Sequence, residues 1–323
     1  MKFISIPKNG SAWSGDLVYV IDTESPEGLD LEVVINDVDH EVELGRCHLY
    51  NITATELNIA PYIRSTDNFV QLGSWTPSAF ISPASRSIDV TVNGLNSDTR
   101  VFYRVPLDYE EDHTLSTIST AQTISLGEPI RLTAFGRDGL QIALEYYSST
   151  RYLGTTLIDE PSYGNPLEII IPTTELPKET HRIQLLIRSA EGHTLQRVVY
   201  CVVERTPSSR RLMWYNSLGG VECYTFPSCV RSRYKADCSN CVTLDGVTAE
   251  QISRRIYYNL TSAYEVEAEM NRLAEMVFSP RIYELRGNDI VEVELSSREV
   301  AFDKHGALRQ MSIEICEKGG VVC

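Results

Sequence analysis

The sequence predicts a mostly β protein with an N-terminal β-sandwich, an immunoglobulin-like β-sandwich and a C-terminal α+β domain with one main helix. Three observations predict this class. Short runs of β-branched and aromatic residues, bounded by turn residues, recur along the chain. A length of 323 residues is long for one hydrophobic core. One segment near the C-terminus has apolar residues at helical spacing. We therefore expect domains over residues 1–112, 113–205 and 206–323.

Residues 1–112 are expected to form the N-terminal sandwich. Ile88, Val90 and Val92 alternate with polar residues, which indicates a strand with one apolar face. Turn residues gather at 24–28 and again at Asn93-Gly94. Six to eight strands at this spacing are typical of a sandwich. The β-rich runs lie at 2–6, 17–22, 29–36, 47–50, 57–64, 88–92 and 101–105.

Residues 113–205 contain about seven alternating runs in about ninety residues, which is the immunoglobulin-like pattern. Cys201 is the only cysteine in this range, so a disulfide between the sheets is excluded and packed sheet faces must hold the domain. The turn 137–139 separates two of the runs. The clearest runs lie at 124–126, 130–134, 140–144, 167–171, 183–187 and 195–203.

Residues 206–211 have the polar, proline-containing composition of a linker, and the run 211–226 then opens the last domain. Trp214 and Tyr215 are typical of a strand, and Gly219-Gly220 lets the chain reverse into a second strand. A hairpin is the favoured interpretation. The alternative is a ligand platform of Trp214, Tyr215 and Asn216 for sugars or peptides, although aromatic clusters are more often part of a core.

The main helix is predicted over residues 265–278. Val266, Met270, Leu273 and Val277 recur at helical spacing and form one apolar stripe. Ser279-Pro280 ends the helix because proline cannot continue the hydrogen-bond ladder. Strands are expected at 252–260, 282–285, 290–295 and 308–316, and the Ser-, Arg- and Cys-rich segment 227–241 is expected to be a loop.

Four cysteines in the last domain have the spacing C-x5-C-x8-C-x2-C. Thiolates at tetrahedral spacing bind Zn²⁺, and C-x2-C supplies two ligands from one turn, but C-x5-C is not a usual zinc knuckle. Three alternatives stay open, namely a structural zinc, a disulfide formed in an oxidising medium and free thiols. The residues are Cys223, Cys229, Cys238 and Cys241.

Two acidic segments are candidate sites of a different kind. The crowded side chains of the first, Asp37, Asp39, His40, Glu41 and Glu43, could supply oxygen ligands to Ca²⁺. This segment lacks the spacing and the glycine of an EF-hand loop, so a solvated loop with an edge strand is favoured. The second, Glu110-Glu111-Asp112-His113, contains acid–base groups at a predicted domain boundary and is interpreted as a solvated charge run.

Catalytic signatures are missing from the sequence. There is no G-x-S-x-G elbow, no H-E-x-x-H motif, no phosphate-binding P-loop and no dinucleotide fingerprint. Carboxylates are numerous enough for a glycosidase pair, but nothing selects which two. We therefore predict that the protein is not an enzyme, and we assign it no catalytic residue, metal ligand or cofactor.

The net charge of −15 disfavours two kinds of partner. Non-specific nucleic-acid binding needs basic patches that release counterions from phosphates, and anionic membrane surfaces attract basic segments. The apolar stretch before Pro7 is too short for a signal peptide, and no segment reaches the length of a membrane span. We therefore expect synthesis in the cytoplasm, with neither nucleic acid nor membrane as partner.

Three runs carry a resemblance to a known class of protein. They are LMWYNSLGG with YTF in 211–226, LNIAPYIR at 57–64 and LAEMVFSPRIYEL at 273–285. In this order, after β-sandwich modules, they resemble virion proteins of tailed bacteriophages and, more narrowly, tail and baseplate components in phages and prophages of anaerobic gut bacteria. The resemblance implies a structural role in a virion assembled in the bacterial host. It also implies other tail subunits as partners and a ring-like homo-oligomer, and it carries over no functional residues.

A second functional hypothesis is an immunoglobulin-like surface adhesin that binds carbohydrate. Trp75, Trp214 or several of the 17 tyrosines would supply its aromatic platform. A third is an enzyme with an unrecognised carboxylate site.

Overall fold

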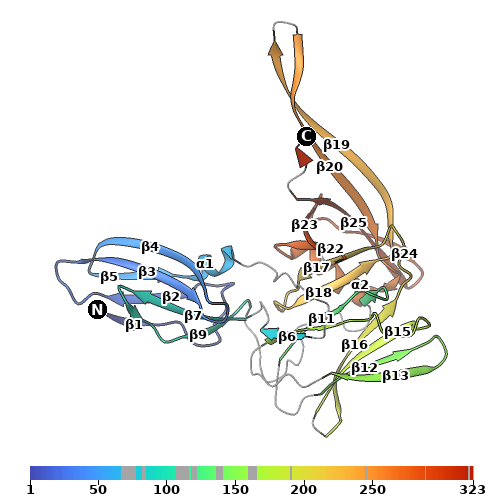
Figure 1. Cartoon of the computed structure of the whole chain (residues 1–323), viewed down its shortest axis with the longest axis horizontal. Helices are drawn as coiled ribbons and strands as arrows, with labels where there is room; N and C mark the ends of the chain where they lie inside the picture. The colour runs from blue at the N-terminus through green and yellow to red at the C-terminus, as the bar shows by residue number, and fades with distance from the viewer. Residues whose placement is uncertain are drawn as a thin grey trace.

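The structure is a computed structural model that describes residues 1–66, 78–81, 85–105, 116–117, 122–135, 141–158, 166–189, 191–243, 246–287, 289–318 and 321–322. For 78–81, 135, 166–167, 236–243, 246–254 and 321–322 it describes the backbone alone. The described chain is mostly β, with one main helix near the C-terminus, as the sequence predicts (Figure 1). The turn 137–139 and the predicted boundary between residues 112 and 113 lie outside the described residues.

The N-terminal region folds as two facing sheets around one core. One sheet has the order β1-β2-β5, and the other has the order β4-β3-β7 with β8 and β9 both paired to β7. Along β3, Leu31, Val33 and Ile35 are buried while the residues between them are not, so one face of this sheet lines the core. The strands are β1 Lys2–Ser5, β2 Val18–Asp22, β3 Leu29–Asp37, β4 Val42–Ile52, β5 Ala54–Asn58, β7 Ser85–Val92, β8 Leu95–Asn96 and β9 Arg100–Tyr103.

The prediction of a strand over 57–64 is wrong beyond Asn58. Helix α1, Ala60–Ser65, follows β5 directly. The backbone N–H of Ala60 donates to Oδ1 of Asn58, which satisfies one of the free donors at the helix start. Pro61 lies in the first turn, where its missing N–H is not needed. Ile63 is buried in the sandwich core, so one short turn of helix closes the end of the sandwich.

The second sandwich has the immunoglobulin strand order. The sheet β10-β16-β15-β12-β13 faces the sheet β11-β14-β6. The parts β16-β15-β12-β13 and β11-β14 correspond to the G-F-C-C′ and B-E orders of immunoglobulin domains, and β6 takes the place of strand D although it precedes β10 in the chain. Buried side chains from both sheets form one core. The bounds are β10 Gln122–Ile124, β11 Ile130–Phe135, β12 Gln141–Tyr147, β13 Tyr152–Ile158, β14 Pro166–Ile171, β15 Arg182–Arg188 and β16 Thr194–Val202.

Strand β6, Ser78–Ile81, comes from the range predicted for the first sandwich but pairs with β14 of the second. Its register places Ile81 opposite Leu167 and Ser78 opposite Ile170. Backbone hydrogen bonds between strands do not depend on separation along the chain, so the pattern of residues 78–81 alone could not indicate this pairing. The two sandwiches are therefore joined by more than a linear connection.

The C-terminal region is built on a ten-stranded sheet whose main path is β18-β17-β22-β23-β25-β20-β19. Strands β21 and β24 pair with β25, and β26 pairs with β20. Strands β17 and β18 form the predicted hairpin around Gly219-Gly220. The bounds are β17 Arg210–Tyr215, β18 Val221–Phe226, β19 Ser228–Thr243, β20 Gly246–Thr261, β21 Glu265–Val266, β22 Ile282–Arg286, β23 Asp289–Leu295, β24 Ala301–His305, β25 Leu308–Glu317 and β26 Val321–Val322.

The main helix lies where the sequence predicts it, but it is shorter. Helix α2 spans Glu267–Ala274, and a 3₁₀ helix, η1, spans Glu275–Phe278. Residues 265 and 266 instead form β21, which pairs with β25. Met270, Leu273 and Met276 are buried against apolar residues of the large sheet. The predicted apolar stripe is buried at Met270, Leu273 and Val277, but the prediction is wrong for Val266, which is 50% exposed and lies before the helix. The tighter last turn before Ser279-Pro280 leaves no signal in that stripe.

The predicted loop over 227–241 is wrong, because these residues belong mainly to β19. Strands β19 and β20 are each 16 residues long and pair with one another to their ends, Thr243 opposite Gly246. Strand β25 pairs with β20 only from Tyr257 to Thr261, and β26 pairs with it only at Ser253 and Arg254. The rest of the hairpin projects from the body as a two-stranded arm (Figure 1). Beyond Asp237 and its partner Ser253, β19 and β20 pair with no other strand that the structure describes, and we call this segment, residues 238–252, the arm.

Candidate functional site

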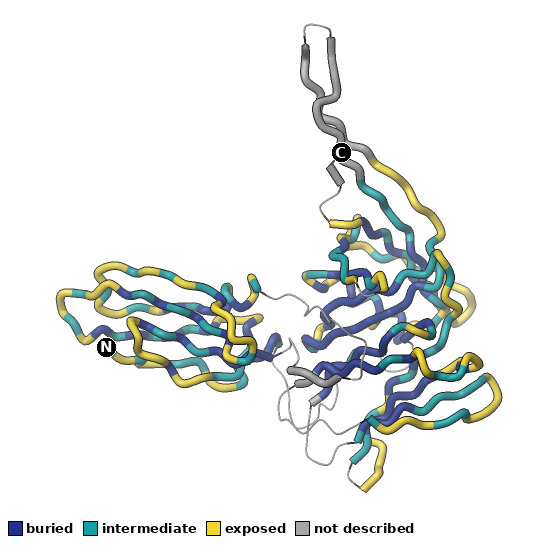
Figure 2. Tube along the Cα trace, viewed as in Figure 1, coloured by how far each residue is buried: buried dark blue, intermediate teal, exposed yellow. Residues whose placement is uncertain are grey.

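The β17–β18 hairpin lies between two apolar cores. Leu212 and Trp214 point into the core with α2, whereas Met213 and Tyr215 belong to a second cluster with Cys223. All six residues of β18 are buried, and so are five of the six in β17 (Figure 2). A strand exposes alternate residues on opposite faces, so both faces of this hairpin are covered. The run 211–226 is therefore a structural junction.

The outer edge of this junction is hydrogen-bonded to the immunoglobulin-like sandwich. The backbone N–H of Val221 donates to Oγ1 of Thr133 at 3.0 Å, and Oγ1 of Thr123 donates to the carbonyl of Thr225 at 2.5 Å. The buried guanidinium of Arg211 donates to two carbonyls of the sandwich, those of Thr123 and Pro129. These contacts fix the sandwich against the large sheet.

Glu222 is buried in the same junction and gathers donors from distant parts of the chain. Its carboxylate accepts hydrogen bonds from Oγ of Ser116 at 2.7 Å, the backbone N–H of Thr117 at 3.1 Å and Nδ2 of Asn216 at 2.7 Å. Nε2 of Gln122 also donates to it. A buried carboxylate is tolerated when hydrogen bonds replace its hydration, so this network is structural.

The structure does not support an exposed platform of Trp214, Tyr215 and Asn216. Trp214 is only 1% exposed and lies in the core with α2. Tyr215 and Asn216 instead line a cavity of about 530 Å³ between the N-terminal sandwich and the C-terminal region. The aromatic residues of this run therefore serve mainly to pack the junction between the regions.

Arg104 links the two walls of this cavity. Its guanidinium carbon lies 3.4 Å from the ring centroid of Tyr215 and 5.7 Å from that of Trp13. Gly219 has a φ of +80°, and a Cβ placed there would lie 3.0 Å from Cβ of Arg104. The end of β9 thus contacts the β17–β18 turn in two ways. The guanidinium of Arg104 lies over the two aromatic rings, and Gly219 leaves room for the stem of Arg104.

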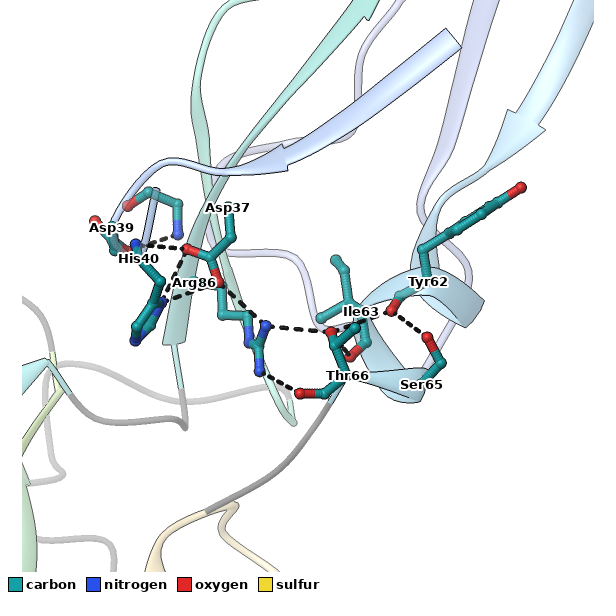
Figure 3. A network of polar contacts seen from close by, with 9 residues as sticks. Asp37, Asp39, His40, Tyr62, Ile63, Ser65, Thr66 and Arg86 are labelled. Carbon is teal, nitrogen blue, oxygen red and sulfur yellow. Dashed lines mark hydrogen bonds and ion pairs between the residues drawn. The ribbon is translucent and has the colours of Figure 1, made fainter. Parts of the chain in front are cut away.

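The acidic segment near residue 40 is a largely exposed turn that is anchored by the buried side chain of Asp37 (Figure 3). Nη1 of Arg86 donates to Oδ2 of Asp37 at 3.1 Å, and Nδ1 of His40 lies 3.0 Å from both oxygens of Asp37. Oδ2 of Asp39 accepts from the backbone N–H of Ser87 at 2.8 Å. Asp37 and Asp39 therefore hold the β3–β4 turn against β7, whereas Glu41 is exposed, as expected of a solvated loop. Glu43 forms an exposed ion pair with Arg46.

The four cysteines do not share one place in the fold. Cys223 is buried in β18 and Cys229 lies at the start of β19, both as free thiols. Cys238 is nine positions beyond Cys229 on the same strand, which is about 30 Å at the usual rise of a strand. A single zinc ion cannot bridge that separation. The side chains of Cys238 and Cys241 lie outside the described part of the chain.

Other predicted sites receive no structural test. Glu110 to His113 and Trp75 lie outside the described residues. Among the residues that the structure describes, no three His, Cys, Asp or Glu side chains gather in a way that could hold a metal ion.

No helix in the described residues is long and apolar enough to cross a membrane.

Comparisons with known proteins assign no family. No family model matches the chain, and no curated protein matches it. Among solved structures, the crystal structure of Dpr2 Ig1-Ig2 in complex with DIP-Theta Ig1-Ig3 is similar over 98% of this chain and 89% of that chain. The sequence identity is 10% and the TM-score is 0.18. A score of this size carries no argument about function.

Proposed function

We propose that this chain is a structural subunit that assembles with other subunits, in the tail or baseplate of a tailed bacteriophage or prophage. The observation that carries the assembly role is the arm. From Gly246 to Ile252, β20 pairs with β19 and with no other strand that the structure describes. A two-stranded hairpin is marginally stable alone in water, so an arm of this length is best explained by a neighbour that covers it.

The described root of the arm has the surface of an interface. Arg231, Arg233 and Lys235 alternate along one face of β19, and all three are exposed. Val230 and Tyr234 are also exposed, at 71% and 64%. Arg233 pairs with Glu314 of the same chain at 2.7 Å. In a chain with a net charge of −15, we expect the basic face as a whole to attract an acidic surface of another copy. The edge of β19 also offers backbone groups to a neighbouring strand.

The phage assignment rests on the sequence resemblance in the runs 57–64, 211–226 and 273–285. Its implications are a location in the virion, synthesis in the bacterial cytoplasm, other tail proteins as partners, a ring-like homo-oligomer and no enzymatic role. Immunogold electron microscopy of particles induced from the encoding bacterium tests it. Gold on the tails is expected, and unlabelled tails beside labelled cell debris contradict the assignment.

The assembly role is tested by shortening the arm. Residues 238–252 are replaced by Asn-Gly, which suits a two-residue turn between the partners Asp237 and Ser253. Light scattering after size exclusion is expected to show concentration-dependent oligomers for the intact chain and monomers for the variant. An unchanged circular dichroism spectrum shows that the body still folds. A monomeric intact chain at the highest concentration, with or without crosslinker, contradicts the role.

The alternative, a carbohydrate-binding surface adhesin, has one favourable observation. Tyr50 on β4 is 73% exposed and leaves an aromatic face open to a sugar. Trp214, the described tryptophan among the candidates, is buried. A glycan array with the intact chain and its Tyr50→Ala variant tests this reading. Binding that needs Tyr50 supports it, and an array without hits removes it.

A further inference from the structure

We propose that the cavity between the N-terminal sandwich and the C-terminal region binds a small amphipathic organic anion, with an aromatic or aliphatic body and one anionic group. The cavity has a volume of about 530 Å³. Sites for small ligands usually measure about 300–1,000 Å³, are mostly apolar and occur preferentially between domains. This cavity has the same size and the same position.

Its apolar wall comes from both sides of the junction. Trp13 is contributed by the N-terminal sandwich, Tyr215 by the end of β17, and Phe278 and Pro280 by the segment around the end of η1. Phe278 is 83% exposed, unlike the other large residues of η1. An exposed phenyl ring at a cavity releases ordered water when a ligand covers it, so Phe278 favours a ligand with an apolar body.

The charged groups of the lining favour an anion. Among the described residues that line the cavity, Arg64, Arg104 and Arg281 stand against one carboxylate, that of Glu275. Oε2 of Glu275 already accepts a hydrogen bond from Oγ of Ser217 at 2.8 Å. In a chain with a net charge of −15, three guanidinium groups around one cavity form a local positive field. Guanidinium groups bind planar anions through paired hydrogen bonds.

The positions of two of these arginines are fixed before any ligand arrives. Nη1 of Arg64 donates to the carbonyl of Trp13 at 3.0 Å, and the guanidinium of Arg104 stacks on Tyr215. Groups that are already oriented lose little side-chain entropy on binding. A ligand in this cavity contacts both the N-terminal sandwich and the C-terminal region.

A matched pair of probes tests the proposal on the intact chain. The anionic probe is 8-anilinonaphthalene-1-sulfonate, and N-phenyl-1-naphthylamine has the same rings without the sulfonate. Calorimetry and probe fluorescence are expected to give one saturable site for the sulfonate. Phe278→Ser should weaken both probes by about tenfold, because it removes a ring from the wall. Arg281→Gln should weaken the sulfonate by about fivefold and leave the neutral probe unchanged.

Tyr50→Ser is the matched control, because it removes an exposed ring outside the cavity lining. It should leave both affinities unchanged. The proposal is overturned if the sulfonate binds the parent chain and Phe278→Ser equally, or if it binds weakly at many sites. It is also overturned if Arg281→Gln weakens both probes to the same extent, because the arginine then only shapes the cavity.

Discussion

At the scale of single residues, the charged side chains in the interior of this acidic chain have opposite charges or donors beside them. Asp37 meets Arg86, and Glu168 lies 3.2 Å from Arg131. Burial raises the pKa of Glu168, and the neighbouring Arg131 opposes that shift. Such pairs gain little net stability over apolar packing, but removing one partner leaves a buried charge uncompensated. Their loss is therefore more informative than their presence.

The Asp37–Arg86 pair gives the first prediction. Asp37→Asn leaves the guanidinium of Arg86 buried without a counter-ion, and we expect it to cost about 3–5 kcal/mol. Glu43→Gln removes an exposed partner of Arg46 and should cost far less, because solvent screens surface ion pairs. Hydrogen exchange at the amides of β3 and β7 measures both. Equal protection in the two variants would mean that the buried pair contributes no more than the surface pair.

Cysteine reactivity gives the second prediction. Burial raises the pKa of Cys223 to about 11. The thiolate is the reactive form, so at pH 8 this thiol is both protonated and inaccessible. Alkylation with iodoacetamide, followed by peptide mass spectrometry, should modify Cys229 first and Cys223 only in denaturant. Modification of Cys223 in the native chain at the rate of Cys229 would contradict its place in the junction.

A short stretch of sequence shows which polar residues are neighbours along the chain, but not which distant residues they meet in the fold. The acidic segment placed Asp37 and His40 close together, but Arg86 is 49 positions away from Asp37 and decides what the carboxylate does. Glu222 likewise meets Ser116 across 106 positions. The aromatic residues at 214 and 215 were recognised, whereas the cavity beside them needs Trp13 and Arg104 from another module. A carboxylate that looks like a metal ligand in the sequence is thus a structural group when a distant residue pairs with it in the fold.

At the scale of secondary-structure elements, periodicity predicted the strands and the helix that have one buried face. Ile88, Val90 and Val92 lie on the buried face of β7 as predicted, and Met270 and Leu273 lie in the buried stripe of α2. Periodicity gives no signal for an element without a buried face. Residues 231–235 of β19 are all exposed, so its alternating basic residues mark no buried apolar face. Helix α1 has only two buried residues, too few for a helical period.

Strand β21, directly before α2, gives the third prediction. Burial, with a smaller contribution from Glu269, raises the pKa of Glu265 to about 7 from the usual 4.5. Between these values the unfolded chain has lost a proton that the folded chain keeps, so stability should fall as pH rises from about 4.5 to 7. Glu265→Gln removes the cost of ionising a buried carboxyl. At pH values above 7 the variant should therefore unfold at a higher urea concentration than the parent chain, whereas near pH 4 the two should unfold at the same concentration.

The control for this prediction is Glu267→Gln, two positions along. Glu267 is exposed and lies 2.7 Å from Arg309, so its replacement should leave the pH slope of the parent chain intact. Urea midpoints at pH 4, 5.5 and 7.5 separate the two variants. A slope in Glu265→Gln that equals the parent slope would show that another group titrates in this window.

At the scale of the whole molecule, the β17–β18 hairpin organises the arrangement. One face closes the core with α2, and its outer edge is bonded to the immunoglobulin-like sandwich. Its turn contacts Arg104 at the end of the N-terminal sandwich. The arm leaves the same sheet at its other end. The order of modules could be predicted from the sequence, whereas the crossing of β6 into the second sandwich could not.

The contact at Gly219 gives the last prediction. Gly219 and Gly287 both have positive φ, +80° and +62°, so an alanine at either position should cost about 1 kcal/mol. Only at Gly219 would the new Cβ meet another residue, 3.0 Å from Cβ of Arg104, whereas Gly287 has no atom within 4 Å. Gly219→Ala should therefore displace Arg104 from Trp13 and Tyr215. The N-terminal sandwich would then be held less firmly against the C-terminal region. Small-angle X-ray scattering should give a larger radius of gyration for Gly219→Ala than for Gly287→Ala. Identical scattering from the two variants would show that this contact does not hold the N-terminal sandwich in place.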